Sequence, residues 1–387
     1  MRNLWRDTRY ALRSLSANRL FAASIILSLG LAIGVTTAVF SFTDAVLLRP
    51  LPWRDANRIV MMWGSKTTEI KRGISGPDLD DLRAQNRCFA DVVPFLPSGN
   101  STSASDGENV NEFEAGTAFF SVLGVQPYLG RPFRPEDSEP GNSHVAVISY
   151  SFWKARFGGD PKAIGRTLTV SGEPYTVIGV APPNFFFPDE KTQAWVPIPH
   201  EMLSGARGGP VVHALARLKP GVTLAEAQSQ VDTIVSRLKS AYPAADKQLV
   251  MGLFPLADQI LGSYRAAIWS LFGGVLLLLL IACANVAHLL LARAMRRGPE
   301  ISVRVALGAT RGDILRQLLT ESLVLAAGGG IVGILIAYWG MRLLLLEHLA
   351  DIPRFREAGI NGTALLFALG ISLVSGLLFG LLPALHA

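Results

Sequence analysis

The 387-residue chain is 50% hydrophobic and only 17% charged, whereas a soluble globular domain carries about 25% charged residues. This composition indicates a membrane protein. The net charge of +6 would suit a nucleic-acid-binding protein, but its distribution excludes that class, because residues 49–264 carry 21 Lys and Arg against 22 Asp and Glu. The basic excess therefore lies beside the apolar segments, where it determines membrane topology.

The chain begins with a basic leader, residues 1–19, that contains five Arg and one acidic residue. Its apolar residues recur near helical spacing, which predicts an amphipathic helix on the inner leaflet of a membrane. Residues 20–48 form the first apolar segment. The long basic leader, the length of the apolar run and the missing small-residue cleavage site favour a retained signal-anchor over a cleaved signal peptide.

Residues 49–264 form a predicted external domain with mixed signals. Val145–Ile148 is typical of a buried strand, and the turn at Ser171-Gly172 predicts a hairpin that joins 167–170 to 175–180. Ser75 predicts a helix that it caps, and Thr223 with Glu226 predicts a capping box at the start of another. Strands and helices alternate, so we expect an α/β or α+β domain with its own core.

Three further apolar segments lie in residues 265–387, and each is long enough to cross a hydrocarbon core, which takes about 20 helical residues. The positive-inside rule places the N-terminus, the loop at 293–321 and the C-terminus in the cytosol. The expected fold is an α-helical membrane protein with four transmembrane helices, in which the external domain is inserted between helices 1 and 2. The four segments are Leu20–Leu47, Ala266–Leu291, Leu323–Leu346 and Ala364–Leu385.

Small residues recur every four positions in two segments, which lets helices approach closely in lipid. Such faces serve either packing within the chain or a dimer seam, and the sequence leaves both open. The residues are Gly30, Gly34 and Ala38 in the first segment, and Ser372, Gly376 and Gly380 in the fourth. Asn285 and His288 share one face of the second segment, where polar groups are costly. We expect them to form hydrogen bonds between helices, with a functional role as the alternative.

No catalytic set is apparent in the sequence. The six His are scattered without metal-ligand spacing, and acidic pairs such as Asp80/Asp81 and Glu136/Asp137 are common on surfaces. The two cysteines, Cys88 and Cys283, indicate no disulfide framework. A Walker A phosphate loop needs Gly-Lys, and the chain has no such dipeptide. We therefore expect no cofactor in this chain, and any ATP would be bound by a separate ATPase.

The polar stretch between the second and third apolar segments predicts two helices. Pro299 suits a first helical position and Glu300 favours the positive helix end, while Gly308 can end the helix with a left-handed C-cap. Thr310 and Asp313 then predict a second helix that runs into the third apolar segment. A force on helix 299–307 would be delivered along that segment. A passive interfacial helix is the equal alternative.

Several motifs together resemble the FtsX/MacB family of ABC transporter permeases, over nearly the whole chain. IACANVAHLLLARAMRR (281–297), EISVRVALGATRGDILRQLLTES (300–322) and GLLFGLLPAL (376–385) resemble the FtsX-like permease domain. FFSVLGVQPYLGRPF (119–133) and the run at 145–182 resemble a MacB-like periplasmic core. The resemblance is strongest to the branch in which the permease unit occurs twice in one polypeptide.

The resemblance implies a bacterial inner-membrane protein whose domain 49–264 is periplasmic. It also implies that helix 299–307 is a coupling helix that docks on a cytosolic ABC ATPase, through residues such as Pro299, Glu300, Arg304, Leu307, Gly308 and Arg311. Relatives dimerise, and ATP binding in the cytosol moves their periplasmic domains, which is called mechanotransmission. Some relatives work with a periplasmic adaptor and an outer-membrane duct.

Three departures from the family pattern bear on partners. The chain carries no fused ATPase, ends at Ala387 directly after the fourth apolar segment, and has one permease unit where its nearest relatives have two. We therefore expect it to pair with a second copy or to be one half of a longer permease. In addition, His288 stands where the family pattern leads us to expect Asn.

The expected function is a non-enzymatic permease subunit, driven by a separate ATPase, for efflux of antibiotics, peptides or other small molecules. The alternative is a mechanotransmission or signalling protein that regulates a periplasmic enzyme without transport. A membrane-anchored enzyme is a weaker alternative.

Overall fold

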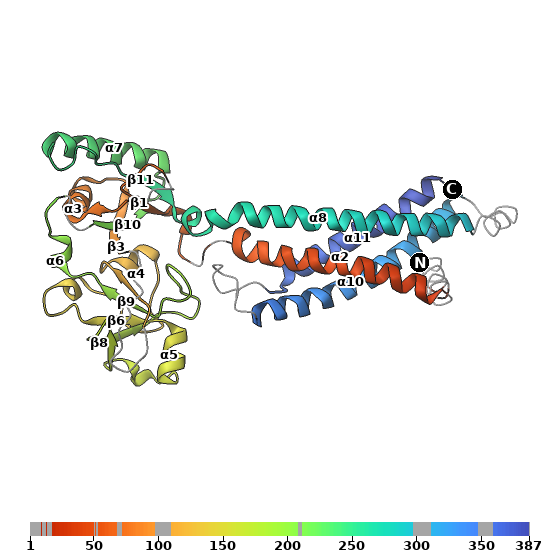
Figure 1. Ribbon diagram of the computed structural model, residues 1–387, viewed down its shortest axis with the longest axis horizontal. Helices are drawn as coiled ribbons and strands as arrows, with labels where there is room; N and C mark the ends of the chain where they lie inside the picture. Colours follow the sequence, from red (N-terminus) through yellow and green to blue (C-terminus); the bar gives the residue numbers. More distant parts are fainter. Residues whose placement is uncertain are drawn as a thin grey trace. The chain divides into compact units, whose positions relative to one another are not determined.

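The computed structural model describes residues 18–49, 53–67, 72–96, 110–207, 211–296, 311–346 and 359–386, and the single positions 9, 13 and 51. The chain divides into two compact units. Met1–Arg49 and Tyr264–Ala387 form the helical unit, and Pro50–Ser263 forms the sheet unit. Figure 1 shows long helices in the first and a sheet with shorter helices in the second. The expected amphipathic leader lies almost entirely outside the described residues.

In its described residues the helical unit contains four long helices, and α2 continues into a π-helical turn, Asp44–Leu48. Their bounds are Arg19–Thr43 for α2, Leu256–Arg296 for α8, Arg311–Leu346 for α10 and Gly362–His386 for α11. Within the described residues, three helical stretches are long and apolar enough to cross a membrane: Arg19–Leu48, Tyr264–Arg293 and Leu319–Leu343. Gly362–Leu378 is a shorter apolar stretch.

The observed starts of α10 and α8 can be compared with the bounds predicted for the third and second apolar segments. The prediction that a helix starting near Thr310 runs into the third apolar segment is confirmed, because α10 is continuous from Arg311 to Leu346. The predicted second apolar segment, Ala266–Leu291, lies within the apolar stretch Tyr264–Arg293, but the helix that carries it, α8, begins earlier, at Leu256. The reason is that its first residues belong to the sheet unit, where Leu256 is fully buried and Gln259 accepts a hydrogen bond from the indole Nε1 of Trp63.

The sheet unit contains an eleven-stranded mixed sheet with the order β11-β1-β10-β3-β4-β9-β6-β8-β5, while β2 pairs with β10 and β7 with β8. The pairs β4–β9 and β6–β8 are parallel, and the others are antiparallel. The strands are β1 (Ile59–Trp63), β2 (Ile74–Ser75), β3 (Phe89–Phe95), β4 (Glu112–Ala115), β5 (Leu129–Gly130), β6 (Val145–Ile148), β7 (Thr167–Val170), β8 (Glu173–Val180), β9 (Ala194–Pro197), β10 (Val211–Leu218) and β11 (Gly252–Pro255).

Five α-helices of the part that the structure describes flank this sheet, with α7 over the β11–β1–β10 end and α5 at the β6–β8 end in Figure 1. They are α3 (Gly76–Gln85), α4 (Phe119–Leu123), α5 (Tyr150–Phe157), α6 (His200–Leu203) and α7 (Leu224–Ala241). The capping predictions are confirmed. Ser75 accepts a hydrogen bond from the backbone N–H of Asp78, and Thr223 and Glu226 form a capping box. The hairpin is also confirmed, with Ser171 and Gly172 at φ 52° and 85°.

Two hydrophobic cores lie in the sheet unit. The first packs α3 and α7 on the β1, β3 and β10 strands, with Val231, Ile234 and Leu238 of α7 turned inward. The second gathers side chains of β6, β7, β8 and β9 around Trp153 of α5. An aromatic series connects the strands between them, from Trp63 through Phe95 and Phe113 to Phe187. Edge-to-face and offset-stacked ring pairs of this kind add about 0.5–1.5 kcal/mol each beyond buried area.

Candidate functional site

The proposed coupling residues mostly lie outside the described part of the chain. Pro299, Glu300, Arg304, Leu307 and Gly308 fall in the range 297–310, and nothing in the structure tests them. Arg311 is the first residue of α10. The described structure therefore bears on the helices that would receive a force, and the docking surface itself stays a prediction.

The small-residue face of α2 packs against α10 within the chain. A Cβ atom on Gly30 would lie 2.7 Å from Cγ1 of Val332, and one on Gly34 would lie 2.9 Å from the carbonyl oxygen of Gly333. Real Cβ atoms do not come this close to neighbours, so only glycine permits this approach of the two helices. Ala38 lies further along and packs on Ala45 and Met341.

The α10 side of this contact is a run of three glycines that the sequence reading did not single out. Gly328 faces Ile26 of α2 and Gly329 faces Leu29, whereas a Cβ on Gly330 would lie 2.5 Å from Oγ of Ser372 on α11. The consecutive glycines therefore allow close contact with two different helices, α2 and α11. The run A-A-G-G-G-x-x-G at 326–333 is the signal that could have identified α10 as the central helix.

Helix α11 packs on a different face of α10 through its own small residues. Ser372 is 8% exposed, and a Cβ on Gly376 would lie 2.9 Å from Cβ of Ala326. The surroundings of Gly380 lie outside the described residues. The structure brings these predicted small residues together around α10. Each of them packs against a neighbouring helix of the same chain: Gly30, Gly34, Ser372 and Gly376.

A polar cluster joins the C-terminal end of α2 to the start of α11. Asp44 is 8% exposed, and its Oδ2 accepts hydrogen bonds from Nε of Arg49 at 3.0 Å and Nδ2 of Asn361 at 3.2 Å. Asn361 in turn accepts from the backbone N–H of Ala364, so it caps α11. Asp44 also begins the π-helical turn, an irregularity often found at functional sites. Arg49 thus pairs with Asp44 at the end of α2, a contact that its position after an apolar segment did not indicate.

Asn285 and His288 lie on an exposed face of α8. The expectation that they form hydrogen bonds between helices stays a prediction. The opposite face of α8 makes the contact with α2, through apolar residues such as Leu279, Cys283 and Val286. Because a helix has 3.6 residues per turn, placing those three inward directs Asn285 and His288 outward.

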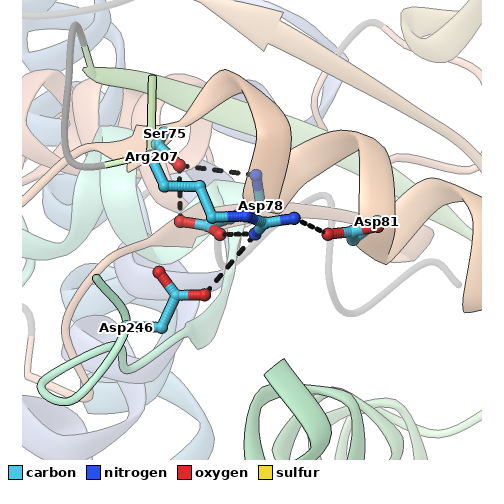
Figure 2. A network of polar contacts seen from close by, with 5 residues as sticks. All are labelled: Ser75, Asp78, Asp81, Arg207 and Asp246. Atoms are coloured by element: carbon cyan, nitrogen blue, oxygen red, sulfur yellow. Dashed lines mark hydrogen bonds and ion pairs between the residues drawn. The ribbon is translucent and has the colours of Figure 1, made fainter. Parts of the chain in front are cut away.

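A buried ionic cluster ties three separate segments of the sheet unit together (Figure 2). Arg207, which lies between α6 and β10, forms ion pairs with Asp78 and Asp81 of α3 and, at 3.4 Å, with Asp246 of the segment after α7. Its guanidinium also lies 3.7 Å above the ring of Tyr242. The side chains of Asp78 and Asp246 are only 4% and 2% exposed, so Arg207 is needed to compensate them.

One carboxylate in this cluster, that of Asp246, has a raised pKa. Burial raises the pKa of Asp246, and the nearby charge of Asp78 raises it further, while Arg207 lowers it. Elsewhere, burial raises the pKa of Asp137 less than its hydrogen bonds and charge pairing with Arg131 lower it, so the net pKa falls. Asp137 is 5% exposed. The acidic pairs read from the sequence as ordinary surface groups therefore include two structural carboxylates, Asp81 and Asp137.

Across the described ranges, no group of three or more His, Cys, Asp or Glu could hold a metal ion. Both cysteines are free. In the helical unit, α2 packs tightly on α10, and α10 packs on α11. Helix α8 is continuous from Leu256 to Arg296.

Comparison with known proteins fits this arrangement. Residues 22–234 match the MacB-like periplasmic core domain, and residues 272–387 match the FtsX-like permease C-terminal domain. The chain belongs to the FtsX/MacB family of ABC transporter permeases. It is accordingly an inner-membrane protein with a large periplasmic domain, and the sheet unit is that domain.

Curated relatives include macrolide export ATP-binding/permease proteins MacB from three organisms. The protein of Hahella chejuensis is 25% identical over 94% of this chain, that of Escherichia coli K12 is 25% identical over 97%, and that of an Azoarcus species is 26% identical over 100%. The matched part is only 56–58% of the length of these relatives. The chain thus spans less than two thirds of them.

Two solved structures are similar to about half of this chain. The periplasmic region of MacB from Actinobacillus actinomycetemcomitans is 18% identical with a TM-score of 0.41, covering 54% of this chain and 94% of that one. The extracellular domain of the ABC-type transporter YknZ from Gram-positive bacteria is 13% identical with a TM-score of 0.37, covering 51% of this chain and 99% of that one.

Proposed function

We propose that the chain is the transmembrane subunit of an ABC-type transporter, and that it converts ATP hydrolysis by a separate cytosolic ATPase into movement of its periplasmic domain. The observation that carries the proposal is the continuity of α8. This 41-residue helix follows β11 without a linker, and it is described as far as Arg296, just before the predicted coupling helix at 299–307. A continuous helix transmits an axial displacement, whereas a loop would absorb it.

The remaining helices, α2, α10 and α11, would form a fixed body beside the moving helix α8. In the proposed topology, the chain crosses the membrane four times, with Gly362–His386 as the fourth span and with the N-terminus, the 297–310 stretch and the C-terminus in the cytosol. The Arg residues at 293–316 support this orientation. The glycine contacts of α10 make α2, α10 and α11 one packed body, against which α8 could slide.

Efflux of antibiotics, peptides or other small molecules is the proposed use of this movement. It is supported by the order of the two matched domains and by the relatives that carry the printed name of macrolide exporters. A periplasmic adaptor and an outer-membrane duct would be further partners, and a second permease unit would complete the assembly. Regulation of a periplasmic enzyme without transport is the alternative, and it differs by leaving drug accumulation unchanged when the gene is deleted.

Charge reversal in the coupling stretch tests the proposal. Glu300→Lys and Arg304→Glu, each in the full chain and in its own membranes, should abolish co-purification of an ABC ATPase while membrane insertion is retained. Arg237→Glu, on the exposed face of α7, is the matched control and should leave recovery of the ATPase unchanged. Recovery at the wild-type level in both coupling variants would contradict the assignment. Recovery of no ATPase with the wild-type chain would contradict the transporter function itself.

A further inference from the structure

Three arginines of the sheet unit lie together beside α4. Arg217 belongs to β10, whereas Arg54 and Arg58 lie in the segment that leads into β1. Side chains alternate across a strand, and Ala216 points into the first core, so Arg217 projects from the other face of β10. There its Nε donates a hydrogen bond to the carbonyl oxygen of Val122 in α4, at 2.7 Å.

The close approach of these arginines follows from the contacts around Gly124, which ends α4 in a left-handed conformation with φ 66°. A Cβ atom on Gly124 would lie 2.8 Å from Cβ of Arg54 and 3.3 Å from Nη2 of Arg217. Arg58 is held next to Arg217 by the neighbouring strand, because its Nε and Nη2 donate to the carbonyl oxygen of Leu218 at 2.9 and 2.6 Å. The three guanidinium groups therefore form one basic cluster.

The positive charge of this cluster is only partly balanced. Asp55 pairs with Arg58, whose Nη1 lies 3.1 Å from its Oδ2. Asp91 lies opposite Arg217 in the register of β10 and β3, but its Oδ1 accepts the backbone N–H of Val92, and it forms no ion pair with Arg217 in the described structure. Three cations therefore share one carboxylate.

Two of the guanidinium groups keep donors that lack acceptors within the described ranges. Arg54 is exposed and forms no hydrogen bond or ion pair with any described residue. Nη2 of Arg217 is enclosed by protein and has no hydrogen-bond partner there. Burial lowers the pKa of Arg217, the charges of Arg58 and Arg54 lower it further, and Asp55 raises it. A buried charged donor without an acceptor costs free energy, so the cluster lacks a negatively charged acceptor.

A phosphate group suits this vacancy. The planar guanidinium group presents paired N–H donors that match phosphate oxygens, and it remains charged in proteins. The stem of Arg54 lies beside Gly124, next to Nη2 of Arg217. Because no described contact fixes the head of Arg54, its side chain can turn, open a way to Nη2 and bind the same anion. Arg58 then adds a third positive charge nearby.

The place of Arg54 in the chain indicates a source for such a phosphate. Arg54 follows Leu48, the end of the first apolar stretch, by six positions, and six residues span at most about 22 Å. The headgroup region of a bilayer extends about 5–8 Å beyond each side of the hydrocarbon core. Phospholipid phosphates of the periplasmic leaflet are therefore within reach of this segment. Free phosphate in the periplasm is the other source of the same chemistry.

We propose that Arg54 and Arg217, together with the charge of Arg58, form a binding site for a phosphate group, either of a phospholipid headgroup or of free phosphate. This site goes beyond the proposed function, because it requires neither an ATPase nor transport. A headgroup bound there would tie the segment between α2 and β1 to the membrane surface.

Calorimetric titration of the full chain in dodecyl maltoside, a detergent without phosphate, tests this site. The probes are dihexanoylphosphatidylglycerol, inorganic phosphate and dihexanoylglycerol, which is the matched lipid without a phosphate. We expect dihexanoylphosphatidylglycerol to bind, and dihexanoylglycerol to give only the background heat of entering micelles. Arg54→Gln should weaken the binding at least about fivefold, because it removes a charge and a charge-assisted hydrogen bond. Arg237→Gln removes one exposed charge from α7 and should leave the affinity unchanged.

Two further variants examine the geometry. Arg54→Lys keeps the charge but not the forked donors, so its affinity should fall between those of the wild type and Arg54→Gln. Arg217→Gln should also weaken binding, but it removes the bond to Val122 as well. Arg54→Gln therefore decides the test, since Arg54 is exposed and its loss leaves the described contacts of the domain in place.

The outcomes separate the two sources. Arg54-dependent binding of dihexanoylphosphatidylglycerol alone supports a headgroup site, and Arg54-dependent binding of inorganic phosphate, with or without the lipid probe, supports a general phosphate site. Binding of neither probe, or an affinity that Arg54→Gln leaves unchanged, would overturn the inference. Recovery of an ATPase with the chain has no bearing on these titrations, so this inference and the proposed function can fail independently.

Discussion

Replacement of Arg207 by Met is expected to loosen the periplasmic domain at one defined place. Arg207 joins α3, the segment before β10 and the segment after α7 through Asp78, Asp81 and Asp246 (Figure 2). Met keeps much of the side-chain volume and removes the charge and the hydrogen bonds. Three carboxylates would then face one another without the cation that compensates them.

The expected cost follows from burial. Breaking a buried ion pair costs about 3–5 kcal/mol, because the remaining charge stays desolvated. Here Arg207 is 16% and Asp81 33% exposed, so water screens part of the loss. We expect a local destabilisation of about 2–4 kcal/mol at neutral pH. The lost contact with the ring of Tyr242 is included in this figure, at about 0.5–1 kcal/mol.

Hydrogen exchange on the full chain in detergent micelles measures this loss directly. Amides of α3 and of the segment 242–249 should exchange about 30- to 1000-fold faster in the variant, since 1.4 kcal/mol corresponds to a factor of ten. Amides of β6 and β8, in the other core, should be unchanged. Arg207→Lys keeps the charge but not the forked geometry, and it should fall between the wild type and Arg207→Met.

The pH dependence distinguishes charge compensation from packing. The pKa of Asp246 is raised in the fold, so its contribution to stability is present at low pH and is lost as the pH rises through that raised value. In Arg207→Met the deficit should therefore shrink as the pH falls towards 4. A deficit of the same size at pH 4.5 and pH 7.5, or faster exchange in β6 and β8 as well, would refute the reasoning.

Three further outcomes are expected. Asp246→Asn should raise the thermal stability of the domain above neutral pH and flatten its pH dependence, because it removes a carboxylate whose ionised form is disfavoured by burial and by Asp78; a lower melting temperature at pH 7.5 would contradict this. Gly34→Leu should cost about 1–3 kcal/mol by overpacking against α10 and lower the yield of folded protein from membranes, while Gly273→Leu, beside open space, should be tolerated. Asp44→Ala should cost about 1–3 kcal/mol by leaving its partners unsatisfied, visible as faster exchange at the start of α11, and exchange at the wild-type rate would exclude a structural role for this cluster.

The sequence by itself determined the features that depend on local physics. Long apolar runs must form helices in a membrane, since every backbone polar group needs a partner there, and α2, α8, α10 and α11 lie where those runs lie. The caps at Ser75 and Thr223 and the hairpin at Ser171-Gly172 depend on neighbours within a few residues, and all three are confirmed. The order of motifs was also enough to indicate the family.

Only the tertiary structure decided the features that depend on contacts between distant residues. Arg207 meets Asp78 across 129 positions and Asp246 across 39, and no periodicity encodes such a pairing. The sequence showed that Gly30 and Gly34 were small, but their neighbour on α10 follows from how three helices pack. The outward direction of Asn285 has the same origin, because a helix has one face for each neighbour and only the fold determines which face α2 takes.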